Sequence, residues 1–377
     1  MEILGGEVIP RLFFKEQNMS NEKLDRIIID RGLDALLLTD GYNIHYLTGY
    51  TGHTGCMVYV DGEITVITDS RYTEQLRKEA KDVNVVDVAN LGYKNAVREI
   101  LNNKIKTGKV GFEDKGISYQ SYNEYKNALK EYTLLPLGES INQLRYVKNK
   151  EEIARLRRAE AIGDEAFSHI IGYMENHEEF SEMDLAIELE TYMKKNGASA
   201  LSFDTIVASS SNSSMPHASV TGRIIKPGDV ITMDFGCIYD GYCSDMTRTV
   251  VYKESKDKEL MTVYNTVLSA QKRALNVIKP GVSCSVVDAA ARDYIREASY
   301  GDYFGHGLGH SVGLYIHEEP RFSPSCNCIL EPGMVITVEP GIYLPGRFGV
   351  RIEDLIVVTE DGYENLTHSP KELLVIG

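Results

Sequence analysis

The feature that most constrains the fold of this chain is a ten-residue segment that occurs twice. "PGDVITMDFG" occupies residues 227–236 and "PGMVITVEPG" occupies residues 332–341, and six of the ten positions are identical. Each copy runs from a Pro-Gly turn through a β-branched apolar run to an acid, Asp234 in the first and Glu339 in the second. A carboxylate at the end of a buried strand is unfavourable unless something positive holds it. The repeat therefore predicts two related strands that deliver carboxylates to a positively charged partner.

The chain around the two copies also repeats. Helical patterns precede each copy, at 150–174 and 181–197 before the first and at 256–281 and 283–301 before the second. Ser181 is a typical N-cap and Gly197 a typical stop signal. The order helix, helix, strands predicts a duplicated α+β domain at 151–377, with repeats at about 151–252 and 253–377. Such a duplication favours a shared site at the interface between the halves, where both can supply ligands.

The first third of the chain follows a different plan. A helix pattern begins at Met19, with Ser20 and Asn21 as the expected caps. Short apolar strands then alternate with helices, which are expected near 71–80, 93–103 and 119–131. This alternation predicts an α/β domain at 19–136, followed by a connector at 137–150. Residues 1–18 fit neither pattern, and we expect their removal to leave melting temperature and activity intact.

Turn signals after each repeated strand predict hairpins that return a second acid to the first. Asp240-Gly241 lies between two β-rich runs, and a hairpin there brings Asp245 back beside Asp234. Pro345-Gly346 plays the same part in the second half and returns Glu353 beside Glu339. Each half is thus expected to offer two acids on adjacent strands.

Four buried carboxylates in one place repel one another without counter-charge. Two divalent cations would neutralise them, and carboxylate-rich sites favour hard or borderline ions such as Mn²⁺, with Co²⁺, Fe²⁺ and Zn²⁺ as alternatives. The competing interpretation, four acids on exposed strands, is opposed by their apolar neighbours and mirrored spacing. The sequence therefore predicts a two-metal site.

Histidines gather in the same part of the sequence. His306, His310 and His317 all lie within "GHGLGHSVGLYIHEEP", and His217 lies on the segment that leads to the first carboxylate strand. Pro320 rules out the helix of a zincin motif, and the glycine spacing does not match a dinucleotide loop. A plain tight loop remains the alternative. Carboxylates and imidazoles around two cations suit hydrolysis of an amide or ester.

Composition limits the remaining function classes. The net charge of -15 argues against an extended nucleic-acid-binding surface. No apolar run reaches about 18 residues, and the start of the chain lacks the pattern of a secretory signal, so we expect a cytoplasmic protein with no membrane span. Of the six cysteines, only Cys326 and Cys328 are close in sequence, and their spacing does not match a structural zinc site. We therefore expect reduced thiols.

At this point the pattern resembles a known family, the pita-bread metallopeptidases: aminopeptidase P, prolidase and methionine aminopeptidase. The resemblance in order and spacing rests on Asp234, Asp245, His310 in "GHGLGHSVGLYIHEEP", Glu339 in "VEPG" and Glu353 in "VRIED". It covers about 146–377, and the segment "GLDALLLTDGYNIHYLTGYTGHTGCMVYVDGEITVITDSRY" is similar to the creatinase-type N-terminal domain of the proline-directed branch. The resemblance implies a duplicated pita-bread catalytic domain preceded by a smaller α/β domain.

The resemblance also implies a role for each metal ligand. Asp234 would chelate one ion, Asp245 and Glu353 would bridge both, and His310 and Glu339 would hold the other. Glu339 would in addition assist proton transfer from the attacking water.

Other residues are implied to act on the substrate. His217 and His317 match histidines that bind substrate and stabilise the tetrahedral oxyanion. His306 would line the pocket, and Arg351 would support the site beside Glu353. The substrates would be peptides with proline at the second position, and the protein is expected to be an enzyme, with a homodimer as an option.

Three alternatives stay open at this stage. The expected activity is that of an Xaa-Pro aminopeptidase, with an Xaa-Pro dipeptidase (prolidase) as the main alternative. Methionine aminopeptidase is less favoured because those chains usually lack the N-terminal α/β domain. A metal-free amidinohydrolase or a binding module of the same fold would have lost ligands, whereas all five are present here.

Overall fold

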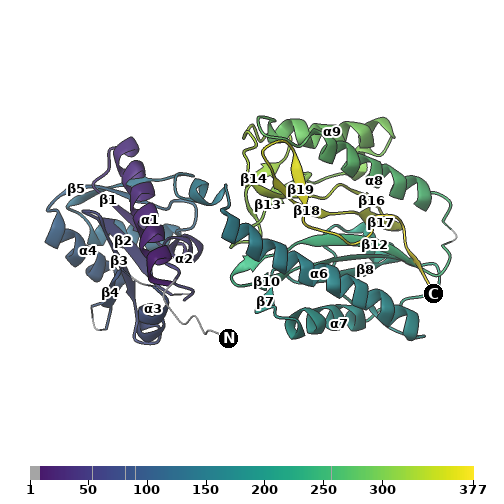
Figure 1. Cartoon of the computed structure of the whole chain (residues 1–377), viewed down its shortest axis with the longest axis horizontal. Helices are drawn as coiled ribbons and strands as arrows, with labels where there is room; N and C mark the ends of the chain where they lie inside the picture. The colour runs from purple at the N-terminus through teal and green to yellow at the C-terminus, as the bar shows by residue number, and fades with distance from the viewer. Residues whose placement is uncertain (1–8, 53, 81, 90, 256) are drawn as a thin grey trace, which may run out of the picture. The chain divides into compact units, whose positions relative to one another are not determined.

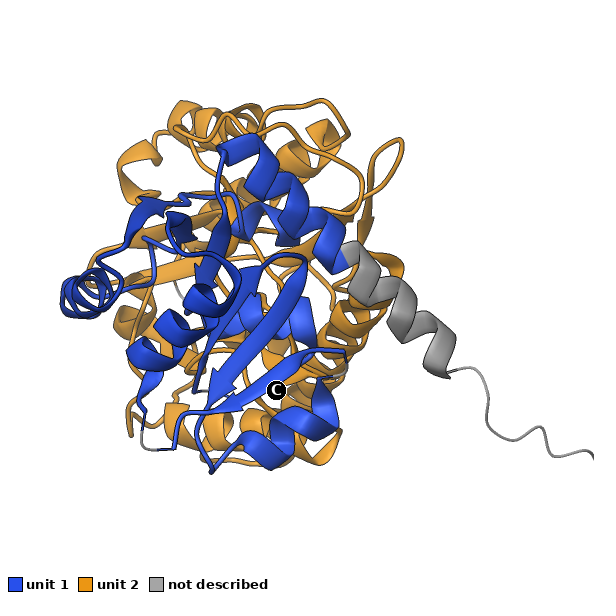
Figure 2. Ribbon diagram, turned by 90° about the vertical axis from the view of Figure 1, so that its left-hand side faces the viewer, with its two compact units in different colours: residues 1–145 blue, residues 146–377 orange. Residues whose placement is uncertain are grey.

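The structure is a computed structural model that describes residues 9–377 except 53, 81, 90 and 256. The chain forms two compact units, Met1–Arg145 and Tyr146–Gly377, which are coloured separately in Figure 2. Both units combine helices with strands (Figure 1). The expected combination of a smaller α/β unit with a larger α+β unit is confirmed.

Unit 1 is built around a six-stranded sheet in the order β4-β3-β2-β1-β5-β6. Its strands are β1 (Ala35–Leu38), β2 (Cys56–Val60), β3 (Glu63–Thr68), β4 (Asn84–Asp87), β5 (Gly108–Phe112) and β6 (Tyr132–Pro136). Its helices are α1 (Ile9–Arg31), α2 (Gly41–Thr48), α3 (Thr73–Glu79), α4 (Tyr93–Lys104), α5 (Tyr119–Ala128) and the 3₁₀ turn η1 (Asn142–Arg145). The pairs β1–β2 and β2–β3 are antiparallel and the others are parallel. Because β1 and β2 carry an unbroken run of buried residues, the sheet has core on both faces.

Two details of unit 1 differ from the sequence-based expectation. Helix α1 already runs from Ile9, so Ser20 and Asn21 lie inside it and the prediction that they cap it is wrong. The Asn21 amide instead donates to the Gly62 carbonyl in the β2–β3 turn, at 3.1 Å. Helix α2 was not expected, because its eight residues are too few for a periodic pattern. It begins at Gly41 and is capped by Asp40, whose carboxylate accepts from the Tyr42 amide. The expectation that removal of residues 1–18 leaves melting temperature and activity intact stays a prediction, and residues 1–8 lie outside the described part of the chain.

Unit 2 repeats one plan twice, as the duplicated sequence predicts. The first half has α6 (Lys150–Asn176), α7 (Glu182–Lys195), β7 (Ala200–Leu201), β8 (Ile206–Ser209), η2 (Ser210–Ser214), β9 (Val230–Phe235), β10 (Cys237–Tyr239), β11 (Tyr242–Cys243) and β12 (Met246–Tyr252). The second half has α8 (Leu260–Val277), α9 (Cys284–Glu297), η3 (Gly301–Tyr303), β13 (Gly309–Ser311), β14 (Glu318–Phe322), β15 (Val335–Val338), β16 (Gly341–Leu344), β17 (Phe348–Arg351), β18 (Asp354–Val358), β19 (Tyr363–Asn365) and β20 (Val375–Ile376). The strands lie between the helix pair α6–α7 and the helix pair α8–α9 (Figure 1).

The starts of α6 and α7 are fixed by local side-chain chemistry. Asn149 and Glu152 form a capping box at α6, and Ser181 and Asp184 form one at α7. Each helix pair then buries its apolar face on its own core cluster, one around Phe167 and the other around Tyr264. The strands that carry the four acids are thereby held between two cores.

The two predicted turns are present. Asp240 and Gly241 both have positive φ, 47° and 83°, as a type I′ turn between β10 and β11 requires. Gly346, with φ of 72°, turns β16 into β17. Strand β9 pairs antiparallel with β12, and β15 pairs antiparallel with β18. The strand of the first repeated segment, β9, therefore pairs with the strand that follows Asp245, and the strand of the second, β15, pairs with the strand that follows Glu353, as expected.

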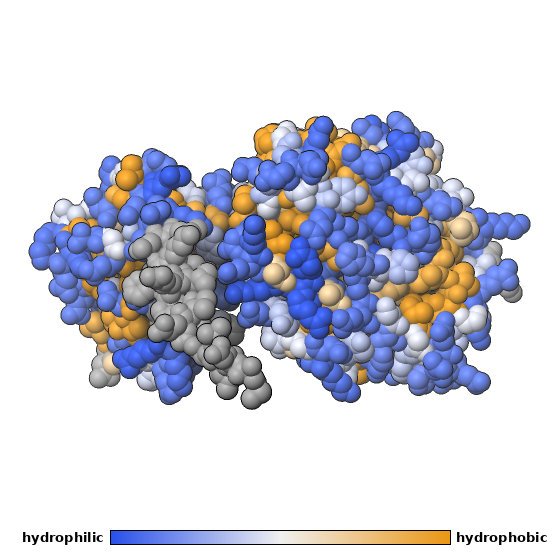
Figure 3. Space-filling model, viewed as in Figure 1, coloured by the Kyte–Doolittle hydropathy of each residue, from blue (hydrophilic) through white to orange (hydrophobic). Residues whose placement is uncertain are grey.

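Hydrophilic side chains predominate on the face of each unit drawn in Figure 3. Within the described residues, no helix has the length and apolar character needed to cross a membrane.

Candidate metal centre and active site

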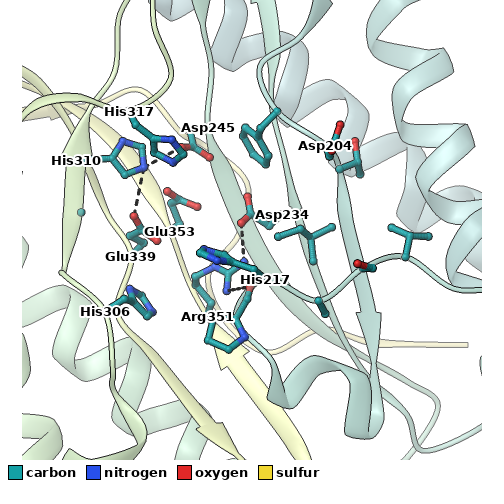
Figure 4. A pocket seen from close by; sticks show the side chains of 18 of the residues that line it. Asp204, His217, Asp234, Asp245, His306, His310, His317, Glu339, Arg351 and Glu353 are labelled. Atoms are coloured by element: carbon teal, nitrogen blue, oxygen red, sulfur yellow. Dashed lines mark hydrogen bonds and ion pairs between the residues drawn. The ribbon is translucent and has the colours of Figure 1, made fainter. Parts of the chain in front are cut away.

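The predicted acids converge from the two halves of unit 2. Asp234 lies near the end of β9, and Asp245 directly precedes β12. Register places Val338 opposite Asp354, so the flanking Glu339 and Glu353 lie at the same end of the β15–β18 pair. Figure 4 shows these carboxylates and His310 pointing toward one another.

His310 joins the acids at close range. Its Nε2 lies 3.4 Å from Asp245 Oδ2 and 3.5 Å from Glu339 Oε1. One ligand atom each from Asp245, His310 and Glu353 fits within 4.8 Å of the others, and all three residues are buried. This spacing suits donors that share a small cation.

Burial changes the protonation of these groups. Burial and the charges of neighbouring acids raise the pKa of Asp245 and of Glu353 well above the usual range. Burial likewise raises the pKa of Glu339 to about 8. Burial and the nearby His317 lower the pKa of His310 to about 3, so its imidazole is neutral and able to bind a cation.

One guanidinium organises the acids. Arg351, buried, donates from Nη2 to Asp234 Oδ2 at 2.6 Å and from Nε to Thr247 Oγ1 at 3.0 Å. Thr247 Oγ1 in turn donates to Glu353 Oε2 at 2.7 Å. Arg351 therefore contacts Asp234 directly and reaches Glu353 only through Thr247, which refines its expected place beside Glu353.

The four acids carry more negative charge than their basic neighbours compensate, and one of their oxygens has no hydrogen-bond donor. Of the lysine and arginine side chains that the structure describes, Arg351 is the one seen to hydrogen-bond to any of the four acids. The second oxygen of Asp234, Oδ1, is buried and has no hydrogen-bond partner. A divalent ion would satisfy this oxygen and reverse the cost of burying the acids, so the donor set fits metal ions.

The four acids open onto a cavity of about 1080 Å³. All nine predicted site residues line it: His217, Asp234, Asp245, His306, His310, His317, Glu339, Arg351 and Glu353. The rings of His310 and His317 pack edge to face with centroids 4.6 Å apart. His306 Nε2 lies 3.0 Å from the Tyr343 hydroxyl, which also accepts from Arg351 Nη1 at 2.7 Å. Burial and the charge of Arg351 lower the pKa of His306 to about 4.

Sequence reasoning missed several residues that support the centre. Thr247 and Tyr343 connect Arg351 to the acids and to His306. Glu160 accepts from the Asp245 amide at 3.2 Å. Alternation offered the one available signal, because Thr247 follows Asp245 by two residues and so lies on the same strand face.

A buried arginine also lies behind the site. Arg248 is 1 % exposed and pairs with Asp354 at 2.9 Å. Its Nη1 donates to the backbone carbonyls of Thr247 and Glu353 at 2.9 and 2.5 Å. Its remaining bonds go to the carbonyls of Ser369 and Pro370. One side chain therefore connects β12, the backbone of Glu353 and the C-terminal segment.

Comparison with known proteins identifies the lineage. Residues 154–360 match metallopeptidase family M24, and residues 21–147 match the creatinase/prolidase N-terminal domain. The chain belongs to metallopeptidase family M24. It is therefore a metallopeptidase by family, and the family implies divalent metal ions, for which the donor set described above is suited.

Relatives match along nearly their whole length. An Xaa-Pro dipeptidase from Pyrococcus furiosus is 38% identical, with 94% of this chain and 99% of the relative aligned. The solved structure of an Xaa-Pro dipeptidase from Bacillus anthracis has a TM-score of 0.90 at 41% identity, covering 96% of this chain and 100% of that one. An X-Pro aminopeptidase structure from Thermotoga maritima has a TM-score of 0.83 at 35% identity, covering 92% and 98%. The expected fold, a pita-bread domain preceded by a creatinase-type domain, is confirmed.

Proposed function

We propose that this M24 enzyme hydrolyses Xaa-Pro dipeptides, with an Xaa-Pro aminopeptidase activity as the second candidate. The observation that carries the proposal is a large cavity lined by four carboxylates, two of them buried, by four histidines and by a half-exposed arginine, Arg321. Relatives named as Xaa-Pro dipeptidases support the first candidate. The relative named as an X-Pro aminopeptidase supports the second, which the sequence alone had favoured.

We propose that two divalent ions are held by Asp234, Asp245, His310, Glu339 and Glu353. Mn²⁺ is the ion that we favour, over Co²⁺, Fe²⁺ and Zn²⁺. Oxygen donors dominate this set, which suits a hard or borderline ion. When bound, such ions polarise the scissile carbonyl and lower the pKa of the attacking water. Two of these acids, Asp245 and Glu353, are buried, whereas Asp234 and Glu339 are partly exposed to the cavity.

The protein's own groups then handle protons and charge. Glu339 lies on the cavity wall beside the other proposed ligands, where its carboxylate is placed to accept a proton from the attacking water. His217 and His317 line the same cavity and are placed to donate hydrogen bonds to the substrate carbonyl as charge develops on it. His306, bonded to Tyr343, bounds the pocket, and Arg351 keeps Asp234 in place.

Arg321 favours the dipeptidase activity. Within the described residues, Arg321 and Arg351 are the only Lys or Arg side chains that line the cavity. Arg351 is bonded to Asp234, and Arg321 donates from Nε to Glu319 at 3.2 Å, so the Nη groups of Arg321 are the donors that we propose for the substrate. The Arg321 side chain is 47% exposed. The pKa of His317 is lowered first by the burial of its own ring and then by the positive charge of Arg321. A guanidinium that lines the same cavity as the histidines is suited to bind the C-terminal carboxylate of a dipeptide.

The test compares substrates with and without that carboxylate. The manganese-loaded enzyme is given Ala-Pro, Ala-Pro amide and Ala-Pro-Ala, with Met-Ala-Ala as the control for methionine aminopeptidase. We expect Ala-Pro to be preferred, and Arg321→Gln to raise its KM about tenfold, the loss of one charge-assisted bond, with little effect on the amide. Arg347→Gln, which alters a surface arginine paired with Asp257, is the matched control.

Equal use of Ala-Pro-Ala by the wild type would favour the aminopeptidase. An Arg321→Gln enzyme that still discriminates between Ala-Pro and its amide would refute the role of Arg321. The cytoplasmic location and the homodimer stay predictions.

A further inference from the structure

Three of the six cysteines meet at the start of helix α9. Cys284 is the first residue of α9, and Cys326 and Cys328 lie in the segment between β14 and β15. The sequence showed only the pair in "CNC", because Cys284 comes 42 residues before Cys326. Helix α9 packs against β14 (Figure 1), which brings the two segments together. We call these three residues the thiol cluster.

Backbone hydrogen bonds fix the relative position of the two segments. Ser283 and Ile329 form an antiparallel bridge. The Cys284 amide donates to the Cys328 carbonyl at 2.9 Å, and the Ser285 amide donates to the Cys326 carbonyl at 2.9 Å. The register that pairs Ser283 with Ile329 places Cys284 opposite Cys328, with Cys326 at the diagonal position.

This register brings the three cysteines close together. Because the Cys284 amide and the Cys328 carbonyl are 2.9 Å apart, the Cα atoms of these two residues are held near the separation of about 4.4–6.8 Å found in disulfides. Cys284, Cys326 and Cys328 also belong to the same hydrophobic cluster, which agrees with the backbone contacts. The backbone contacts therefore hold the three thiols beside one another at the edge of one core.

Exposure divides the three thiols into two kinds. Cys284 is buried against the α8–α9 core, whereas Cys326 and Cys328 are partly exposed at the edge of the same core. An oxidant in solution can thus reach Cys326 or Cys328 first, while Cys284 is positioned to attack the oxidised sulfur. A reachable thiol beside a second thiol is the arrangement of a reversible oxidation site. Burial raises the pKa of Cys284 and of Cys328, so little thiolate is present at neutral pH and we expect oxidation to require excess peroxide.

We propose that the thiol cluster is an oxidation site in which Cys284 forms a reversible disulfide with Cys326 or Cys328. A peroxide oxidises the partly exposed thiol to a sulfenic acid, and its O–O bond breaks to release water. The Cys284 sulfur then attacks the sulfenic sulfur, the S–S bond forms, and the hydroxyl leaves as a second water. The two thiols lose two electrons and two protons, and one molecule of peroxide is reduced to two molecules of water.

The position of the cluster connects it to the cavity wall. Arg321, in β14, and Ser323, directly after β14, line the cavity and come shortly before Cys326 in the sequence. Helix α9 holds the other wall, since Arg292 donates to the His306 carbonyl at 2.7 Å and Asp288 accepts from the Leu308 amide at 3.1 Å. A disulfide would join these two supports covalently.

Peptide mapping tests the proposal directly. The full-length protein is reduced, treated with excess hydrogen peroxide, alkylated and digested without reductant. We expect a cross-linked peptide that contains Cys284 and either Cys326 or Cys328, and that dithiothreitol cleaves. We also expect the oxidised protein to melt several degrees higher than the reduced one, because the new bond closes a loop of about 40 residues.

Variants make the result specific. Cys284→Ser should abolish the cross-link and leave a sulfenic acid that dimedone traps at Cys326 or Cys328. The double variant Cys326→Ser/Cys328→Ser changes only partly exposed positions and should leave Cys284 reduced. Cys56→Ser, at a buried cysteine of unit 1, is the matched control and should retain the cross-link. Separate alkylation of all three thiols in the peroxide-treated wild type would overturn the proposal. These readouts do not depend on peptidase activity.

Discussion

Replacing Arg248 with methionine tests how the metal centre is supported from behind. The guanidinium is 1 % exposed and its partner Asp354 is fully buried. Methionine keeps an apolar stem but removes the charge and every donor to the carbonyls of Thr247, Glu353, Ser369 and Pro370. Breaking a buried ion pair from one side typically costs about 3–5 kcal/mol of unfolding free energy. Asp354 keeps its bonds to Lys371 and Asn365, at 2.6 and 2.9 Å, which places the expected loss at the lower end.

For a domain of the size of unit 2, a loss of about 3–5 kcal/mol corresponds to a melting temperature roughly 6–20 °C lower. Calorimetry and urea unfolding measure the loss. Because Arg248 also holds the backbone of Glu353, titration calorimetry should show Mn²⁺ binding about tenfold more weakly, as with other changes behind metal ligands. Arg155→Met is the matched control, since Arg155 pairs with Asp240 at the surface and should cost at most about 1 kcal/mol. An Arg248→Met protein as stable as Arg155→Met would refute this account of the support.

Two further outcomes follow from buried polar groups. Glu113 is buried and accepts from the amides of Thr39 and Asp40, and burial raises its pKa from 4.5 to about 7. Since the folded state then binds more protons than the unfolded state, the contribution of Glu113 to stability is complete below pH 4.5 and is lost as the pH rises toward 7. Urea unfolding should show the free energy of unfolding falling with pH across this range, and Glu113→Gln should flatten that dependence. The same pH dependence in Glu113→Gln would contradict the assignment. Thr247→Val removes the hydroxyl between Arg351 and Glu353. It should lower kcat/KM for Ala-Pro about tenfold, consistent with an unmade buried bond costing about 1–3 kcal/mol, whereas a wild-type value would show that this bridge is dispensable.

The repeated segment made much of the site predictable. The strand pattern placed Asp234 and Glu339, and turn chemistry at Asp240-Gly241 placed Asp245, because both signals are local in sequence. The thiol cluster and the Arg351–Asp234 bond were out of reach. They join residues that are 42 and 117 positions apart, and only the packing of separate elements brings them together.

The errors have a similar origin. Ser20 and Asn21 are good caps by residue type, yet a helix that continues to Ile9 leaves no start for them to cap. Arg248 stands within an apolar strand, where pattern alone gives no partner. Its partners, Asp354 and the carbonyls of Ser369 and Pro370, come from the last quarter of the chain.

The central claim is that Asp245 and its neighbours hold the metal ions that hydrolysis requires. The direct measurement strips wild-type protein and Asp245→Asn with a chelator, and then follows Mn²⁺ binding by calorimetry alongside Ala-Pro hydrolysis as Mn²⁺ is restored. We predict that the wild type binds two equivalents and recovers activity in step with binding. Asp245→Asn should bind Mn²⁺ weakly and hydrolyse Ala-Pro at less than about one hundredth of the wild-type rate, in line with the several kcal/mol that a catalytic metal supplies. Full hydrolysis by the stripped wild type, or normal Mn²⁺ binding by Asp245→Asn, would contradict the account.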